Sequence, residues 1–177
     1  MIMGKRIFFH GYWDQIGCTG EVYQRFIDYA FEQADSFMLV YVNSGGHGYT
    51  KRQKYYRDNL KKFKIKSRTD ARWPLQSHRP EEPPTTYKVV FYKTHPDAKP
   101  FLLEAGALHQ WGGSYPANLA FFKGNICWFA FEYDFGLAGF FHATPQDLQF
   151  AVENGLADQN AAEAMDQWDL FEEALEA

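Results

Sequence analysis

The chain has 177 residues, of which 46% are hydrophobic and 19% aromatic, and a formal net charge of −4. This length predicts one domain over residues 1–177 that buries about 70% of the surface of the unfolded chain. The longest wholly apolar run, residues 126–131, is far shorter than the roughly 20 residues of a membrane helix, and the first residues lack the hydrophobic segment of a signal peptide. We therefore expect a cytoplasmic protein with no membrane partner.

Charge is distributed unevenly along the chain. Residues 51–79 contain eleven Lys or Arg against Asp58 and Asp70, whereas residues 124–177 contain eleven Asp or Glu and no Lys or Arg. Such segments can attract a partner of opposite charge or attract each other. The basic segment also holds aromatic residues that could stack on bases, but the negative net charge and the acidic C-terminal third argue against a nucleic-acid partner.

The only two cysteines are Cys18 and Cys127. They lie far apart in the sequence and lack the paired spacing of zinc ligands. We expect neither a disulfide framework nor a metal site, and we expect no cofactor.

The first part of the chain predicts two strand–helix units. Residues 5–13 predict a strand, residues 21–35 a helix with apolar residues at i, i+4 spacing, and residues 37–43 a second, buried strand. Thr50 is the expected N-cap of a helix over residues 51–63 that is basic on most of its surface. Two such units in succession predict neighbouring parallel strands.

The rest of the chain shows a different pattern. Residues 70–86 contain four prolines and predict an irregular excursion, after which residues 87–93 predict a strand and residues 100–110 a short helix. Thr, Pro and an acid open a helix over residues 144–154. Residues 159–177 predict a last, acidic helix with an apolar stripe, which either docks on the body or is offered to a partner.

The densest apolar run, residues 119–143, predicts three antiparallel strands in the middle of the sheet. Gly124-Asn125 provides a two-residue hairpin turn that places Phe121 opposite Trp128. Because these strands are apolar on both faces, we expect helices on both faces of the sheet. The predicted fold class is α/β in the broad sense, a mixed α+β fold around a central mixed sheet.

A ligand site is predicted at the loops 14–20 and 43–50. The loops that follow two neighbouring parallel strands meet at one sheet edge, and backbone N–H groups of glycine-rich turns there can hold an anion such as a small phosphorylated ligand. The loop 44–48 matches neither the Walker loop nor the dinucleotide fingerprint, so its glycines could equally form only a tight turn. The candidate ligand-binding residues are Thr19, Asn43, Ser44, Gly45, Gly46, His47, Gly48 and Thr50.

Cys18 is a candidate nucleophile. It precedes a predicted helix N-terminus, which lowers the pKa of a thiol, and His10 or His47 could act as its base. Six residues separate Cys18 from Arg25, rather than the five of the phosphatase cysteine loop. A buried structural cysteine is therefore the favoured interpretation.

Glu132 and Asp134 form a second candidate pair. They lie on one face of a predicted strand, and His142 could approach them from the next strand. Paired carboxylates can do acid–base work or hold a divalent ion, although acids at a strand end are more often only solvated.

The hairpin 123–128, Lys-Gly-Asn-Ile-Cys-Trp, and the segment 144–156 carry a family resemblance. Residues 97–156 resemble the C-terminal part of small bacterial proteins without an established function, some of which bear the name stage III sporulation protein AH. Those proteins tend to show His-Glu shortly after the tryptophan, where this chain has Phe131-Glu132. The resemblance implies a bacterial cytosolic protein and implies no mechanism.

Two functions remain open on the sequence. The charge segregation and the absence of a complete catalytic motif favour a non-enzymatic module that binds a protein partner. The alternative is an enzyme or sensor that binds a small phosphorylated ligand at the loops 14–20 and 43–50.

Overall fold

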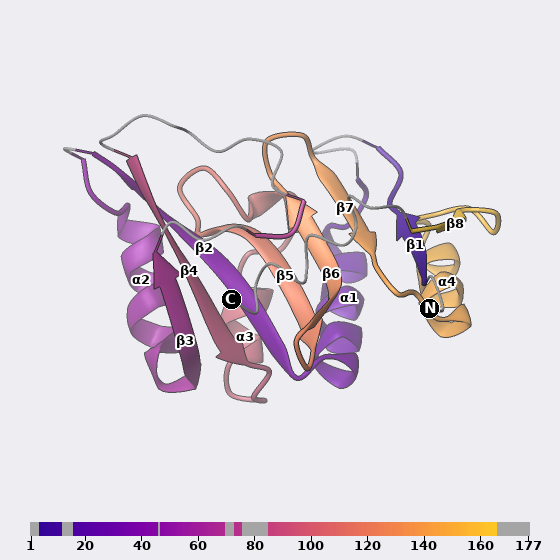
Figure 1. The fold of residues 1–177 in the computed structure, drawn as a ribbon, viewed down its shortest axis with the longest axis horizontal. Helices are drawn as coiled ribbons and strands as arrows, with labels where there is room; N and C mark the ends of the chain where they lie inside the picture. Colours follow the sequence, from indigo (N-terminus) through magenta and orange to yellow (C-terminus); the bar gives the residue numbers. More distant parts are fainter. Residues whose placement is uncertain (1–3, 12–15, 46, 70–72, 76–84, 166–177) are drawn as a thin grey trace.

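The computed structural model describes residues 4–11, 16–45, 47–69, 73–75 and 85–165. Within these ranges the chain forms one sheet covered by helices (Figure 1). In chain order the elements are β1 (Lys5–Phe8), α1 (Gly20–Gln33), β2 (Ser36–Ser44), α2 (Lys51–Leu60), the 3-10 helix η2 (Lys61–Phe63), β3 (Lys64–Thr69), β4 (Thr85–Lys93), α3 (Lys99–Leu103), the 3-10 helix η3 (Leu108–Gln110), β5 (Ala117–Lys123), β6 (Ile126–Glu132), β7 (Leu137–Phe140), α4 (Pro145–Glu153) and β8 (Ala162–Ala164).

The mixed α+β fold class is confirmed, but the sheet is not mixed. Its strand order is β3-β4-β2-β5-β6-β7-β1-β8, and each described pair is antiparallel. Because direction alternates across the sheet, β1 and β2 do run the same way, as a strand–helix–strand unit requires. They are not neighbours, however, since the meander β5–β6–β7 is inserted between them.

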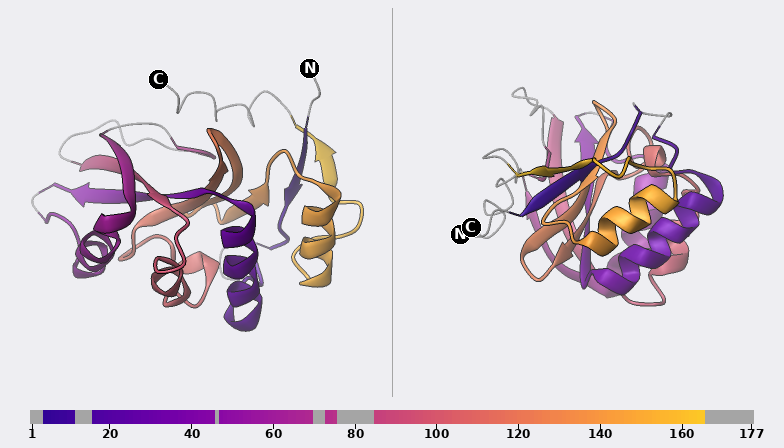
Figure 2. Two further views of the ribbon diagram at one scale, coloured as in Figure 1. Left: turned by 90° about the horizontal axis from the view of Figure 1, so that it is seen from below. Right: turned by 90° about the vertical axis from the view of Figure 1, so that its right-hand side faces the viewer.

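The helices of the described chain cover one face of the sheet, not both (Figure 2). Residues from all four α-helices pack in one core cluster with the larger side chains of the sheet. The opposite face carries a second, smaller core cluster, in which Ala120, Cys127 and Ala130 lie beside Phe122, and Trp73 and Met165 belong to the same cluster.

A β-bulge in the central hairpin changes which face its aromatic residues occupy. The turn at Gly124 is confirmed by the pairing of Lys123 with Ile126, but Phe121 lies opposite Phe129, not opposite Trp128. The extra residue of the bulge puts Trp128 and Phe129 in the same helix-side core. The strict alternation predicted for this strand is therefore wrong at this position.

The helix predicted over residues 159–177 is not formed where the structure describes it. Ala162–Ala164 instead form β8, which pairs with β1 at the edge of the sheet. Residues 166–177, and most of the predicted excursion 70–86, lie outside the described residues. None of the helices within the described ranges is long and apolar enough to span a membrane.

Candidate functional site

Helix α2 is fixed to the sheet by its first turn. The side chain of Thr50 accepts a hydrogen bond from the backbone N–H of Gln53 (3.0 Å), which confirms Thr50 as the N-cap. The buried side chain of Gln53 in turn accepts a hydrogen bond from the N–H of Val42 (2.9 Å) near the end of β2. Tyr56 and Leu60 are buried on the same side of the helix, so its remaining residues face water.

The exposed side of α2 continues through η2 into β3, the edge strand beside it (Figure 1). We call the cations on these elements the basic surface. Its members are Lys51, Arg52, Lys54, Arg57, Lys61, Lys62, Lys64, Lys66 and Arg68. Of these nine cations, only Arg57 forms an ion pair within the described chain, with the adjacent Asp58 at 3.0 Å. The predicted pairing of this basic segment with the acidic C-terminal third is therefore not seen there.

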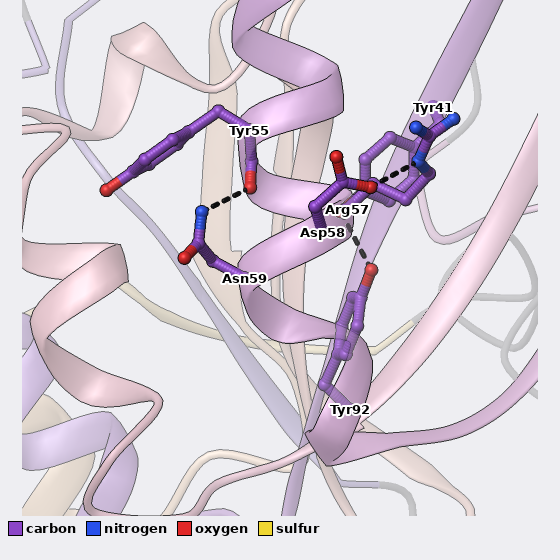
Figure 3. Close-up of polar contacts among 6 residues, drawn as sticks. All are labelled: Tyr41, Tyr55, Arg57, Asp58, Asn59 and Tyr92. Atoms are coloured by element: carbon purple, nitrogen blue, oxygen red, sulfur yellow. Dashed lines mark hydrogen bonds and ion pairs between the residues drawn. The ribbon is translucent and has the colours of Figure 1, made fainter.

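A pocket of about 370 Å³ opens within the basic surface. Lys88, Val90 and Tyr92 line it as alternate residues of β4, and Tyr41 lies opposite Lys88 on β2. The remaining lining residues are Tyr49, Arg57, Asp58, Lys61 and Lys64. Figure 3 shows that the phenol groups of Tyr41 and Tyr92 point toward each other beside Arg57 and Asp58 of α2.

The two phenol groups form a buried pair. The hydroxyl oxygens of Tyr41 and Tyr92 are 2.7 Å apart, and the two residues are only 2% and 1% exposed. Burial raises the pKa of Tyr92 to about 12 and that of Tyr41 further still, while the nearby positive charge of Arg57 acts to lower both pKa values. Both hydroxyls therefore keep their protons at neutral pH.

The predicted loop 43–50 lies next to this pocket but is organised differently from the expected anion cradle. The N–H of His47 donates to the carbonyls of Ser44 and Gly45, and the N–H of Gly45 donates to Asn43. These groups are thus used within the loop. Thr50 donates through its hydroxyl to the carbonyl of Ser114 (2.5 Å). Gly46 lies outside the described residues. None of the predicted ligand-binding residues that the structure describes lines the pocket.

The predicted residues before α1 lie elsewhere. Thr19 forms an isolated bridge with Ala107. Cys18 is 1% exposed, and burial raises the pKa of its thiol far above the ordinary value. A thiol in this state is not an activated nucleophile, which favours the structural interpretation of Cys18.

The two candidate bases are not brought to Cys18 as a group. The Nε2 atom of His10 is 3.0 Å from a carboxylate oxygen of Asp158, beyond β1. His47 follows β2, and β2 lies four strand positions from β1 in the sheet, or roughly 19 Å at ordinary strand spacing. The shared rim expected for these histidines depended on β1 and β2 being neighbours.

The pair Glu132 and Asp134 is not joined by His142. Glu132 is buried and accepts a hydrogen bond from the N–H of Phe135 (2.8 Å), so it closes the turn between β6 and β7. His142 follows the other end of β7, where Phe140 pairs with Phe129. Among the described residues, no three His, Cys, Asp or Glu side chains come together as metal ligands.

A larger cavity, of about 690 Å³, lies at the opposite ends of the strands. Its wall includes Phe91, Phe122 and Lys66, and the Lys66 ammonium lies 4.9 Å from the centre of the Phe91 ring. Asp35, also in its wall, accepts the N–H of Gly124 (2.8 Å). The buried polar groups without partners lie outside this cavity, so nothing there calls for a specific ligand.

The pocket residues were missed by sequence reasoning for an identifiable reason. Tyr41 and Tyr92 both lie in correctly predicted strands. The apolar pattern of those strands indicates only that the two residues belong to the core. Their hydroxyls meet only because β4 pairs with β2, and no local pattern reports that pairing.

Comparison with known proteins adds no relatives: no family model, no curated protein and no solved structure matches the chain. The resemblance of residues 97–156 to proteins named stage III sporulation protein AH stays a prediction.

Proposed function

We propose that this chain is a non-catalytic binding protein whose basic surface engages an acidic segment of another protein. One observation carries the proposal: of the nine cations on α2, η2 and β3, only Arg57 has an ion-pair partner within the described chain. Unpaired charges of one sign on one surface raise the encounter rate with a partner of opposite sign. A bacterial source and a cytoplasmic location remain part of this proposal.

The edge strand β3 supports an extended partner segment. In the described chain β3 pairs only with β4, so its outer row of backbone N–H and C=O groups has no strand beside it. Such an edge can accept a further strand through main-chain hydrogen bonds. Lys64, Lys66 and Arg68 line this edge and repel a second copy of the same strand. An acidic strand would meet no such repulsion, which gives the edge a preference between partners.

The large exposed side chain on this strand fits the same role. Ile65 is 49% exposed and lies at a bulge between Lys64 and Lys66. It offers an apolar contact within a cationic border. We therefore expect the partner segment to combine acidic residues with at least one apolar side chain.

Fluorescence anisotropy tests this proposal with a labelled Asp- and Glu-rich peptide that contains one leucine. The test variant carries Lys64→Glu, Lys66→Glu and Arg68→Glu, and the control carries the same charge change at Lys5, Arg25 and Lys123, outside the basic surface. We expect the test variant to lose at least about tenfold in affinity, because several ion contacts become repulsive, and we expect the control to bind like the unmodified protein.

Equal losses in both variants would show that binding follows net charge alone, and the proposal would then fail. A labelled single-stranded oligonucleotide serves as the second probe. Tighter binding of the oligonucleotide at physiological ionic strength would replace the protein partner with a nucleic acid.

A further inference from the structure

The Tyr41–Tyr92 hydroxyl pair has two O–H protons, but the contact between the two oxygens uses only one of them. Neither hydroxyl has another hydrogen-bond partner within the described chain. Both residues line the pocket and are almost completely buried. The described chain supplies no acceptor for the second proton, and a ligand in the pocket can supply one.

The charged residues that line the pocket around this donor are mostly positive. Arg57, Lys61, Lys64 and Lys88 line the pocket, against the single carboxylate of Asp58. Asp58 is held by Arg57 at 3.0 Å, so the three lysines have no ion-pair partner in the described residues. An acceptor that enters this pocket is thus most strongly favoured if it carries more than one negative charge.

We propose that the pocket between α2, β2, β3 and β4 binds a phosphate monoester. A phosphate monoester carries nearly two negative charges at neutral pH and three acceptor oxygens. It can accept the spare tyrosine proton while its other oxygens face Arg57 and the lysines. A carboxylate would leave most of the surrounding charge uncompensated. The inference rests on the proposed basic surface, of which this pocket is a part.

The pocket also has room for the group that carries the phosphate. Its volume of about 370 Å³ exceeds that of a phosphate ion, and Val90 and Tyr49 provide apolar wall. The ring of Tyr49 lies 6.5 Å from that of Tyr41 in an edge-to-face arrangement. Such a wall suits the carbon atoms next to the ester oxygen, whether the phosphate belongs to a protein side chain or to a small molecule.

The two hydroxyls have distinct roles in this arrangement. One hydroxyl donates its proton to the other and is held by that bond. The hydroxyl that accepts keeps its own proton for an acceptor in the pocket. Phe37 stacks on Tyr92 with ring centres 5.2 Å apart, which holds the ring in place. Removal of only one hydroxyl would leave a donor free, so the test has to remove both.

Isothermal titration calorimetry with phenyl phosphate tests the proposal, and benzoate is the matched monoanion. The central variant is Tyr41→Phe/Tyr92→Phe, which keeps both rings and replaces both partners of one hydrogen bond, a change that leaves the fold close to neutral in stability. A second variant, Lys64→Gln/Lys88→Gln, removes two charges, and Lys5→Gln/Lys123→Gln removes two charges outside the pocket. Thermal unfolding of each variant checks that it is folded.

We expect phenyl phosphate to bind the unmodified protein at least about tenfold more tightly than benzoate, and each pocket variant to weaken phenyl phosphate by about tenfold or more. The Lys5/Lys123 control should bind like the unmodified protein. An unchanged affinity in the folded Tyr41→Phe/Tyr92→Phe variant would overturn the proposal. A phosphoserine peptide and glucose 6-phosphate, titrated in parallel, distinguish a protein-borne phosphate from a small molecule.

The two proposals fail in different ways. If the unmodified protein binds the acidic peptide but no phosphate monoester, the phosphate site is overturned and the basic surface stands. If it binds neither, both are overturned.

Discussion

At the residue scale, buried polar groups show which parts of the molecule are fully satisfied and which are not. Asp147 is completely buried and accepts hydrogen bonds from the hydroxyl of Tyr29 (2.6 Å), the indole N–H of Trp128 (3.1 Å) and the N–H of Thr144 (2.8 Å). The Tyr41–Tyr92 pair, by contrast, keeps a spare donor. The first arrangement is structural, and the second is where a ligand is expected.

The substitution Asp147→Asn should destabilise the protein although it changes one atom. Each carboxylate oxygen of Asp147 accepts a hydrogen bond. An amide has only one acceptor oxygen and no charge, so either its NH₂ group faces the N–H donors of Trp128 and Thr144 or the Tyr29 hydroxyl has to accept instead of donate. We expect the free energy of unfolding to fall by about 2 kcal/mol. Urea denaturation measures this, with the exposed Asp158→Asn as control. Equal midpoints for the two variants would contradict the structural role of Asp147.

The buried phenols also predict a loss of stability at high pH. Burial raises the pKa of Tyr92 from 10.0 to about 12 and that of Tyr41 above it, so the unfolded chain releases these protons at lower pH than the folded protein. This contribution to stability is fully present below about pH 10 and is lost as the pH rises from there through the folded pKa values. Urea midpoints measured across this range should fall, and they should fall less steeply in Tyr41→Phe/Tyr92→Phe. Parallel curves would contradict the burial of the pair.

At the element scale, helix starts were the best-predicted features because they depend on local chemistry. Thr144 caps α4 in a capping box with Asp147, as its sequence indicated. The strand β3 was not predicted, because Lys64–Thr69 is an edge strand with little burial and so lacks an apolar repeat. Residues 162–164 likewise form a strand only through pairing with β1.

The substitution Gly139→Ala should disrupt the junction between β7 and β1. A Cβ atom at Gly139 would lie 2.6 Å from the backbone oxygen of Ile7 and 3.2 Å from the Cα of Phe8. Backbone atoms of a paired strand cannot move aside as a flexible side chain can, so we expect a loss of roughly 2 kcal/mol or more in the free energy of unfolding. Chemical denaturation checks it. A variant as stable as the unmodified protein would show that β1 is not held as described.

At the scale of the whole molecule, the order of the strands in the sheet could not be predicted from the sequence. The direction of β1 and β2 followed from the chain, but their separation by three strands did not, because no local pattern reports the long-range pairing of the meander with β2. The predicted site at the loops 14–20 and 43–50 required β1 and β2 to be neighbours in the sheet, which they are not. The segregation of charge, visible in the sequence, places the basic surface at the β3 edge and Glu163 of β8 at the other, beside Arg6.

This separation explains why the basic surface is open to a partner. Glu163 cannot reach β3, since it lies on β8, and β8 and β3 are the two edges of the same sheet. Of the nine cations of the basic surface, only Arg57 has an ion-pair partner in the described chain, and at low ionic strength the field of this surface should extend further into the solvent.

The most direct test of this account is the affinity of the intact protein for an Asp- and Glu-rich peptide, measured by anisotropy at low and at physiological ionic strength. The account predicts binding that weakens as salt is added and that is lost at least about tenfold in the Lys64→Glu/Lys66→Glu/Arg68→Glu variant. An affinity that depends neither on salt nor on these three residues would contradict it.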